Sequence, residues 1–397
     1  MHTRTAVVLA AGEGTRLRPL TQNRPKPMLP AANRPILEHV LDALVEAGIK
    51  QIVLVVGHRR ERVQSYVGPS YRDVPVEYVI QGKQLGSGHA LLQAAETVSE
   101  PLLVVNGDRL IESAAVEAVG TAFAGSERPA AMAVIERDHV SRYGVVSLDG
   151  EEVTELIEKP DSEGHGMINA GIYAFEQSIF DEIDATPRQS GELALTDTIG
   201  RLVDRRAVTG VPIEGMWVDA TYPWDLLSVA REVLDRGRTS EPELDHGVWI
   251  DDQVGIHDDA TLQPPVVVGP DCEIAAGAVV GPNVALSRNV TVEPNATVER
   301  AVVDEDSRIG HGSTVIDTVV GQDTDIGAGT VIPGGPSDVR VGNQIHEEQA
   351  LGAVLADRVE VGGGVSFEPG TLVGTEAKIG PGAYVHGHVP IDAEVLR

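Results

Sequence analysis

The sequence predicts an α/β domain with a mostly parallel sheet, followed by a parallel β-helix. Three observations lead to this fold class. The chain has 397 residues, more than one ordinary compact domain holds. Its first part, of about 230 residues, alternates strand-like apolar runs with helical patterns. Beyond that part, aliphatic residues recur at every sixth position. We therefore expect one domain over residues 1–238, a linker over 239–247 and a second domain over 248–397.

Short apolar runs mark the strands of the first domain, at 5–10, 52–56, 76–80, 102–105 and 131–135. Between the first two runs, apolar residues recur at helical spacing, and Gly48 stands where a left-handed helix cap is expected. The apolar residues of this helix are Ile36, Leu37, Val40, Leu41, Leu44 and Val45. A second helix is expected around 222–235, before the polar, Pro- and Gly-bearing linker sequence at 236–247.

The second domain is defined by its period of six, which fits neither an amphipathic helix nor an alternating strand. The period predicts a three-sided coil with one inward aliphatic residue per short strand and Gly, Asn or Asp at the corners; separate strands of a sandwich are the alternative. The predicted inward residues are Val268, Ile274, Val280, Leu286, Val292, Val298, Val303, Ile309, Val315, Val320, Ile326, Ile332, Leu355, Val361, Phe367, Val373, Ile379, Val385 and Ile391. The stretch resembles the hexapeptide-repeat family, which implies a left-handed β-helix and commonly a homotrimer. Residues 333–349 break the period and should form a loop outside the coil.

Charge is the unusual bulk property of the chain. It has 60 acidic and 31 basic residues, a formal net charge of -29, and lysine occurs only at 26, 50, 83, 159 and 378. Self-repulsion of this size favours screening by salt. An ordinary acidic cytosolic protein is the alternative, and the scarcity of lysine favours a salt-rich, halophilic cytoplasm over it. Without a basic stripe, nucleic acid is not an expected partner. No apolar run approaches the roughly 20 residues that cross a bilayer, and Cys272 is the single cysteine. We therefore expect a soluble cytoplasmic protein with no membrane partner.

A glycine-rich turn follows the first apolar run, in AVVLAAGEGTRLRPLT (6–21), and PKPM (25–28) comes soon after it. Glycines let backbone N–H groups approach a phosphate that a side chain would obstruct, and Arg16 and Lys26 add positive charge nearby. The turn lacks the third glycine of a dinucleotide fingerprint and the GKS or GKT ending of a P-loop. By itself it also fits an ordinary tight turn.

Together, GxGTRLxPLT and PKPM resemble the signature of the sugar-phosphate nucleotidylyltransferases, and the resemblance covers nearly the whole chain. It implies a Rossmann-like nucleotidyltransferase domain in which Arg16 holds the leaving end of a triphosphate and Lys26 neutralises the phosphate under attack. Such transfers depend on positioning and on dispersal of negative charge more than on covalent help. The residues expected around the nucleotide phosphates are Ala11, Gly12, Gly14 and Thr15.

Two aspartates are the expected ligands of a metal ion. Asp108 ends VVNGD directly after an apolar run, which is the ligand-binding edge of a parallel sheet, and Asp219 lies in MWVDATYPWD. The family resemblance implies that both chelate one Mg²⁺, which would bridge the nucleotide and sugar phosphates. An aspartate after a strand also fits a turn or a helix cap. Asp225 is a competing candidate, although its place in PWDLL suggests a helix surface.

Base recognition is assigned to Gln81, because a side-chain amide offers one donor and one acceptor to a pyrimidine edge. QLGSGHA (84–90) follows it and resembles the equivalent segment of N-acetylglucosamine-1-phosphate uridylyltransferases, with Ser87 where Thr is usual. Gly86 and Ser87 are expected to add contacts to the base, whereas His89 is expected to pack or cap.

Three short segments match the family on the sugar side: RYGVV, IEKP and INAGIY. They contribute Gly144, Glu158, Lys159 and Asn169. A carboxylate such as Glu158 accepts hydrogen bonds from sugar hydroxyls, and an ammonium such as Lys159 pairs with the sugar phosphate. In isolation, IEKP would equally fit a surface Glu and Lys before a turn proline.

His311, in RIGHGSTVID, stands where the β-helix of bifunctional relatives carries the general base of an acetyltransferase. The surroundings depart from that pattern: Thr314 replaces a tyrosine, Glu299 a lysine, and Gly334 and Gly335 an asparagine and a tyrosine. A histidine without its partners loses orientation and oxyanion support. A coil that forms the trimer and places the catalytic domains is therefore favoured over acetyl transfer.

The expected activity is uridylyl or thymidylyl transfer from UTP or dTTP to glucose 1-phosphate or N-acetylglucosamine 1-phosphate, with release of pyrophosphate. Three alternatives stay open at this point. They are a mannose-1-phosphate guanylyltransferase, a bifunctional enzyme with acetyltransferase activity in the β-helix, and a non-catalytic regulatory subunit. The last is disfavoured because the charged residues at 16, 26, 108, 159 and 219 are all present.

Overall fold

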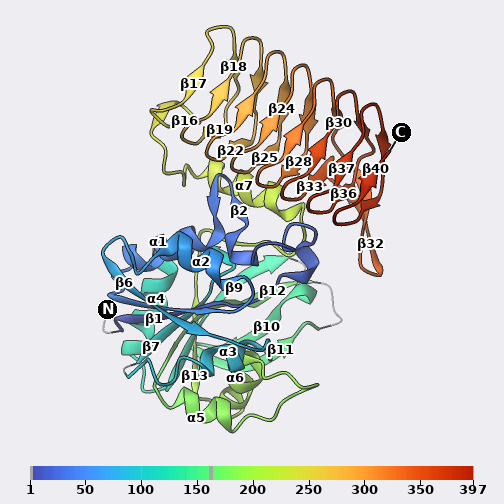
Figure 1. The fold of residues 1–397 in the computed structure, drawn as a ribbon. Helices are drawn as coiled ribbons and strands as arrows, with labels where there is room; N and C mark the ends of the chain where they lie inside the picture. Colours follow the sequence, from blue (N-terminus) through green and yellow to red (C-terminus); the bar gives the residue numbers. More distant parts are fainter. Residues whose placement is uncertain (1–2, 100, 139, 161–163, 397) are drawn as a thin grey trace. The chain divides into compact units, whose positions relative to one another are not determined.

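A computed structural model describes residues 3–99, 101–138, 140–160 and 164–396 (Figure 1). The chain divides into two compact units. The sheet unit comprises residues 1–13 and 36–218, and the coil unit comprises residues 14–35 and 219–397. The glycine-rich signature segment and Asp219 thus belong to the coil unit. The division at residues 238 and 248 remains a prediction about domains.

The sheet unit is built on a ten-stranded mixed sheet in the order β10-β11-β13-β9-β12-β7-β1-β4-β6-β5. Its centre is parallel, because β1 pairs in parallel with both β4 and β7, whereas β12 runs antiparallel between β7 and β9. The strands are β1 (Thr5–Ala10), β4 (Gln51–Val56), β5 (Ser70–Tyr71), β6 (Val74–Ile80), β7 (Leu102–Asn106), β9 (Ala130–Asp138), β10 (Gly144–Asp149), β11 (Glu152–Glu158), β12 (His165–Phe175) and β13 (Val208–Pro212). Short strands β8 (Arg109–Ile111) and β14 (Trp217–Asp219) lie outside this sheet.

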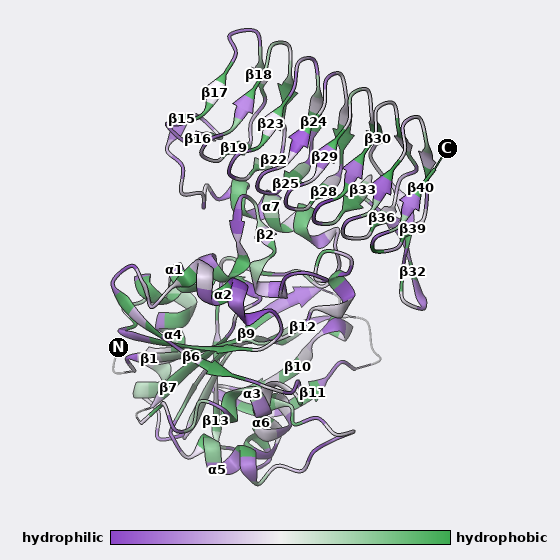
Figure 2. Ribbon diagram, in the orientation of Figure 1, coloured by the Kyte–Doolittle hydropathy of each residue, from purple (hydrophilic) through white to green (hydrophobic). Residues whose placement is uncertain are grey.

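Helices of this unit bury apolar side chains. In α1 the buried residues include Ile36, Leu37, Val40, Leu41 and Leu44, as the helical spacing predicts. The helices of this unit are α1 (Ile36–Glu46), α2 (Arg60–Val67), α3 (Ser87–Leu92), α4 (Ser113–Ala124), α5 (Ile179–Asp184), α6 (Leu195–Asp204) and the 3-10 turn η3 (Val140–Arg142). Apolar colour follows the central strands in Figure 2. The central strand β4 is buried along nearly all its length. All five predicted strands are present, and Gly48 has the predicted positive φ of 86°.

The coil unit contains a three-sided parallel β-helix, consistent with the left-handed coil of hexapeptide repeats (Figure 1). Successive turns pair in register: Val268 lies beside Leu286, three hexads later. One side comprises β15 (Glu243–Asp245), β16 (Val248–Ile250), β19 (Val266–Val268), β22 (Val284–Leu286), β25 (Ala301–Val303), β28 (Thr318–Val320), β33 (Ala353–Leu355), β36 (Thr371–Val373) and β39 (His388–Val389). The second comprises β17 (Gly255–Ile256), β20 (Glu273–Ile274), β23 (Thr291–Val292), β26 (Arg308–Ile309), β29 (Asp325–Ile326), β34 (Glu360–Val361), β37 (Lys378–Ile379) and β40 (Glu394–Val395). The third comprises β18 (Thr261–Leu262), β21 (Val279–Val280), β24 (Thr297–Glu299), β27 (Thr314–Ile316), β30 (Val331–Pro333), β35 (Ser366–Phe367) and β38 (Tyr384–Val385).

The predicted inward residues form the core of the coil, with one exception. Ile391 is 46% exposed, and the prediction for it is wrong. The last turn is shorter than the earlier ones: Val373 pairs with Val389, 16 residues on, whereas Val268 pairs with Leu286, 18 residues on, and Leu286 with Val303, 17 residues on. Val389 therefore takes the inward place. Corner residues have positive φ as predicted, at Asp271, Asn283, Asn289, Asn295, Asp306, Asp317 and Asp323.

Three further parts complete the coil unit. The segment 333–349, where the loss of the period predicts a loop outside the coil, contains a two-stranded antiparallel hairpin, β31 (Ser337–Val341) with β32 (Gln344–Gln349). The predicted second helix is α7 (Asp225–Asp235). Residues 14–35 hold the 3-10 turns η1 (Thr15–Leu17) and η2 (Lys26–Met28) and the short strands β2 (Pro30–Ala31) and β3 (Arg34–Pro35). Throughout the described ranges, every helix is too short or too polar to span a bilayer.

Candidate active site

The signature segment contains two 3-10 turns, η1 and η2, which approach each other closely. Gly14 has a φ of 66°, and a Cβ there would come within 2.9 Å of the Lys26 Cβ, so only glycine lets the two turns approach. The Thr21 hydroxyl donates a hydrogen bond to the Gly14 carbonyl oxygen (2.8 Å). Thr15 and Arg16, on η1, are exposed to solvent. The turn therefore presents the Arg16 guanidinium outward and keeps Lys26 against its backbone.

Lys26 and Asp219 are 193 residues apart in the sequence and form an ion pair, with 3.0 Å between Lys26 Nζ and Asp219 Oδ1. Both side chains are largely buried, at 12% and 9% exposed. The Thr221 hydroxyl donates to the other Asp219 oxygen at 3.2 Å. The structure thus brings together one predicted phosphate-binding cation and one predicted metal ligand.

Asp225, the competing metal candidate, has a structural role at the start of α7. Its Oδ2 accepts hydrogen bonds from the backbone N–H groups of Thr221 and Tyr222, both at 2.8 Å. Because these N–H groups belong to the turn that precedes α7, the Asp225 carboxylate stabilises the backbone between Asp219 and the helix.

In the sheet unit, Ala11, Gly12 and Asp108 follow neighbouring parallel strands. Leu9 of β1 pairs with Asn106 of β7, so the segments after both strands leave the sheet at the same edge. This edge is where open α/β sheets bind ligands. Ala11 is buried and its carbonyl oxygen accepts from Gln84 Nε2 at 2.9 Å, whereas Gly12 is exposed.

The predicted base-binding residues are held in place by one another. Gln81 is only 6% exposed, and its Nε2 lies 3.0 Å from both the Gly86 carbonyl oxygen and His89 Nδ1. Burial and the nearby Arg188 lower the pKa of His89, so the neutral ring accepts the Gln81 amide hydrogen. The Gln81 amide nitrogen is therefore engaged within the protein.

Gly86 and Ser87 also serve the fold. A Cβ on Gly86 would come within 2.4 Å of the Leu193 carbonyl oxygen, so this position needs glycine. The Ser87 hydroxyl accepts from the backbone N–H of Leu195 at 2.9 Å. These contacts attach the start of α3 to the segment that precedes α6.

The sugar-side residues Gly144, Glu158 and Asn169 converge on strands β10, β11 and β12. Gly144 pairs with Glu158 across the β10–β11 ladder, and the Cβ position of Gly144 lies 3.7 Å from the Asn169 Cβ. Asn169 is 6% exposed; it donates to the Tyr173 hydroxyl oxygen (2.8 Å) and accepts from the Gly171 N–H (3.0 Å). Lys159 lies beside this group, with its Nζ 3.9 Å from Glu158 Oε1, and both of these side chains are about half exposed.

Sequence reasoning missed an aromatic and cationic cluster beside Asn169. The Arg109 guanidinium lies over the Trp217 ring at 5.1 Å and donates to the Asn169 carbonyl oxygen at 3.3 Å. Trp217 Nε1 donates to the Ala170 carbonyl oxygen at 2.7 Å, and Arg137 and Tyr143 also contact the ring. The signal was in the sequence, since Arg109 directly follows Asp108 and Trp217 lies two residues before Asp219.

His311 is exposed on the coil. Its backbone N–H donates to Glu293 Oε2 at 2.8 Å, and its carbonyl oxygen accepts from Gly329 N–H at 2.8 Å. The hydrogen bond from Arg308 lowers the pKa of Glu293, which keeps that carboxylate ionised. These contacts stabilise neighbouring turns of the coil.

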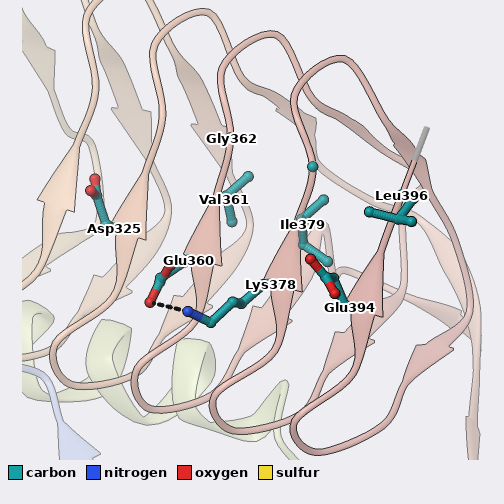
Figure 3. A pocket seen from close by; sticks show the side chains of 9 residues that line it. Asp325, Glu360, Val361, Gly362, Lys378, Ile379, Glu394 and Leu396 are labelled. Atoms are coloured by element: carbon teal, nitrogen blue, oxygen red, sulfur yellow. Dashed lines mark hydrogen bonds and ion pairs between the residues drawn. The ribbon is translucent and has the colours of Figure 1, made fainter.

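A hollow of about 310 Å³ lies on the outer face formed by β29, β34, β37 and β40 (Figure 3). Asp325, Glu360 and Glu394 line it with one cation, Lys378, which pairs with Glu360 at 3.0 Å. Three carboxylates against one paired ammonium do not suit a phosphate ligand. Within the described ranges, no three His, Cys, Asp or Glu side chains gather as a protein-only metal site.

The family model for nucleotidyl transferases matches residues 5–236. The chain belongs to the nucleotidyl transferase family. A second model, the GMPPB C-terminal domain, matches residues 262–372 of this nucleotidyl transferase. The "Bifunctional protein GlmU" of Methanococcus maripaludis strain S2 is 32% identical over 99% of this chain and 97% of its own length.

Two other similar proteins match the N-terminal part of this nucleotidyl transferase. The "UTP--glucose-1-phosphate uridylyltransferase AglF" of Haloferax volcanii is 36% identical over 55% of this chain and 92% of its own length. The solved structure of UTP-bound UGPase from Acinetobacter baumannii is 26% identical, with a TM-score of 0.53, and the match covers 61% of this chain and 95% of that one. The AglF and UGPase relatives thus correspond to little more than the N-terminal part of this chain, whereas the GlmU relative matches nearly the whole chain.

Proposed function

We propose that this nucleotidyl transferase moves a uridylyl or thymidylyl group from UTP or dTTP to glucose 1-phosphate or N-acetylglucosamine 1-phosphate, releasing pyrophosphate. The Lys26–Asp219 ion pair carries the proposal. It unites a cation and a carboxylate from two separate signature segments, and both groups are needed where phosphate charge is neutralised. The names of the GlmU, AglF and UGPase relatives support this substrate class.

The reaction we propose is a direct attack of a sugar-phosphate oxygen on the α-phosphorus, with pyrophosphate as the leaving group. Arg16 binds the leaving end of the triphosphate, while Lys26 neutralises the phosphate under attack. Backbone groups of Ala11, Gly12, Gly14 and Thr15 surround the phosphates. No covalent enzyme intermediate is required, because positioning and charge dispersal supply most of the acceleration in such transfers.

We assign base recognition to Gln81, Gly86 and Ser87. The amide nitrogen of Gln81 is engaged by Gly86 and His89, which fixes the side-chain orientation and assigns its Oε1 to the base. On the sugar side, Glu158 accepts from hydroxyls, Asn169 and the Gly144 backbone shape the pocket, and Lys159 pairs with the sugar phosphate.

The carboxylates of Asp108 and Asp219 are the proposed ligands of a Mg²⁺ ion. Carboxylate oxygens suit this hard cation, which usually takes one or two carboxylates and completes its shell with substrate phosphates and water. When bound, the metal would supply Lewis-acid neutralisation of the phosphates.

The test is an assay of the purified chain with Mg²⁺, in high and low salt, offering each sugar phosphate with UTP, dTTP or GTP. We expect pyrophosphate and a nucleotide sugar with UTP or dTTP, and loss of both on adding EDTA. Release with GTP alone would favour a mannose-1-phosphate guanylyltransferase. Silence with every triphosphate would favour a regulatory subunit, and release of coenzyme A from acetyl-CoA with glucosamine 1-phosphate would add the acetyltransferase activity.

We further propose a homotrimeric, cytoplasmic, salt-adapted enzyme. The net charge of -29 supports salt adaptation, because counterions screen the self-repulsion of the folded chain. Val331 and Tyr384, on the third side of the coil, are 41% and 63% exposed, which supports a contact between copies there. Light scattering gives the mass directly, and a monomer at all salt concentrations would contradict the trimer.

A further inference from the structure

Arg24 is a buried cation in the signature segment. It lies between Arg16 and Lys26, is 1% exposed, and makes ion pairs with Asp304 and Asp357 of the β-helix. The Arg24 Nη2 to Asp357 Oδ1 distance is 2.9 Å. Arg24 and Asp304 are 280 residues apart in the sequence, and all three residues belong to the coil unit.

The β-helix backbone fixes both carboxylates that hold Arg24. Asp304 Oδ1 accepts from the Glu305 N–H at 2.9 Å, and Asp357 Oδ1 accepts from the Gln322 N–H at 3.2 Å. Asp304 directly follows β25 and Asp357 lies two residues after β33, with β28 between these strands. Gly321 follows β28, and a Cβ there would come within 2.7 Å of Asp357 Oδ1. The absence of a side chain at Gly321 thus leaves room for the Asp357 carboxylate that pairs with the Arg24 guanidinium.

A buried arginine with two aspartates does little for stability in itself. Desolvating three charges offsets much of their attraction, and well-packed apolar side chains of similar size often stabilise a protein as much or more. What such a group supplies is a defined position. Burial would lower the pKa of Arg24, but Asp304 and Asp357 raise it overall, so the guanidinium stays charged.

Only Pro25 separates Arg24 from Lys26, and its ring fixes its φ. Holding Arg24 in place therefore restricts where the Lys26 backbone can lie. Two more contacts attach the same segment to the coil unit. Gln22 Oε1 accepts from the Thr375 N–H at 3.3 Å, and Asn33 Nδ2 donates to Glu241 Oε1 at 2.6 Å. The segment therefore depends on contacts outside itself for its shape, because its 3-10 turns are only three residues long.

The partner of Lys26 is held by the same β-helix. The hairpin β31–β32 places the His346 ring 4.3 Å from the Tyr222 ring and 5.1 Å from the Trp224 ring, and these two rings stack on each other at 4.8 Å. Tyr222 and Trp224 follow Asp219 within five residues, and α7 behind them contacts β25 and β28. Both members of the Lys26–Asp219 pair are thus located by the coil.

We propose that Arg24 is a positioning residue through which the β-helix sets the placement of Lys26 for nucleotidyl transfer. The inference rests on the proposed function for its catalytic consequence. It makes the coil part of the transfer machinery and not only an appended module. The coil would then be required for full activity even in an enzyme that performs no acetyl transfer.

The test compares three full-length variants with the natural chain. Arg24→Met removes the cation; Arg24→Met/Asp304→Asn/Asp357→Asn also removes the unpaired carboxylates and restores neutrality. Arg300→Met is the matched control, since it breaks the Arg300–Asp317 pair of the same coil (2.6 Å) without touching residues 14–35. Integrity of the coil is followed by the shielding of the buried Cys272 thiol from a thiol reagent.

For Arg24→Met we expect kcat to fall about 100-fold, the scale of a displacement of about 1 Å at a reacting group. The KM for the triphosphate should change less than about threefold, because other groups still bind it. The triple variant should regain thermal stability but not kcat. Recovery of both would overturn the proposal and leave Arg24 with a purely structural role, as would a normal kcat in Arg24→Met.

Hydrogen exchange separates a failure of this inference from a failure of the proposed function. In Arg24→Met, amides of residues 14–35 should exchange at least about tenfold faster, while amides of β19, β22 and β25 stay protected. Unchanged exchange over 14–35 would overturn the positioning role even if the natural enzyme is active. A natural chain that is silent with every triphosphate would instead remove the proposed function, and the exchange result would still decide whether Arg24 orders the segment.

Discussion

The proposed phosphate-binding cations and the proposed base- and sugar-binding groups are held in different ways. Arg16 and Lys26 lie on short 3-10 turns of the coil unit, and Asp219 is the last residue of the short strand β14. Ion pairs of Lys26 and of the buried Arg24 fix the backbone there. Gln81 and Asn169 lie at the end of or within strands of the sheet unit, where ladder pairing and amide hydrogen bonds hold them. Irregular segments therefore depend on contacts with residues far away in the sequence, whereas strands are already held by the hydrogen bonds of their sheet.

The largest expected effect is on the reactivity of Cys272, which reports how well the core of the coil excludes solvent. Burial raises the pKa of Cys272 to about 12, and its thiol donates to the Ser287 carbonyl oxygen at 2.9 Å. An exposed cysteine titrates at about pH 8.5 and would be partly thiolate at pH 8. We expect Cys272 to react with a thiol reagent more than about 10³-fold slower at pH 8 in the native chain than in denaturant.

The sign of the pH effect on stability follows from the same shift. Because the folded thiol has the higher pKa, its contribution to stability is present below about pH 8.5 and is lost as pH rises toward the folded value. Fast labelling at pH 8 without unfolding would contradict a closed coil. Labelling that tracks loss of the circular-dichroism signal is the expected behaviour.

A second effect separates catalytic cations from ordinary surface charges. Lys26→Met should lower kcat about 10²–10³-fold, the cost of removing one group that stabilises transition-state charge. Lys378→Met is the matched control, because Lys378 also pairs with a carboxylate, Glu360 at 3.0 Å, but on the outer face of the coil. Pyrophosphate release should be lost in the first variant and unchanged in the second. Equal activities would remove Lys26 from the mechanism.

A third, smaller effect concerns the sheet unit. Glu158→Gln should raise the KM for the sugar phosphate at least about tenfold, since a hydrogen bond to a charged group contributes about 1.5–3 kcal/mol. The KM for the triphosphate should stay the same. Glu155→Gln, on the same strand β11 and also exposed, is the control and should change neither constant. A rise in the KM for the triphosphate instead would mean that Glu158 acts on the nucleotide.

The smallest expected effect is at His311. Its side chain is exposed and the contacts described for it are made by its backbone, so His311→Ala should keep nucleotidyl transfer within about twofold and stability within about 0.5 kcal/mol. Parallel kinetics and thermal unfolding check both. A large loss of transfer would show that the coil has a catalytic role different from the positioning role of Arg24.

Much of this protein follows from the sequence by local rules. A period of six means one inward aliphatic residue per short strand, and helical or strand-like spacing defines α1 and the strands of the sheet, so both folds and their order are readable without a structure. The glycine-rich turn and its cations likewise identify phosphate chemistry, because only a few residue types suit it. Where a local repeat changes length, as before Val389, the period misleads, and Ile391 is the result.

The contacts between residues that are distant in the sequence are visible only in the tertiary structure. Nothing near Arg24 in the sequence indicates that Asp304 and Asp357 receive it, that His346 stacks on Tyr222, or that the Gln81 amide is engaged by Gly86 and His89. Periodicity reports how one element buries its own face, whereas an ion pair across 280 residues depends on how two elements pack. Short motifs therefore identify the residues for the chemistry, whereas the fold determines where those residues lie relative to one another.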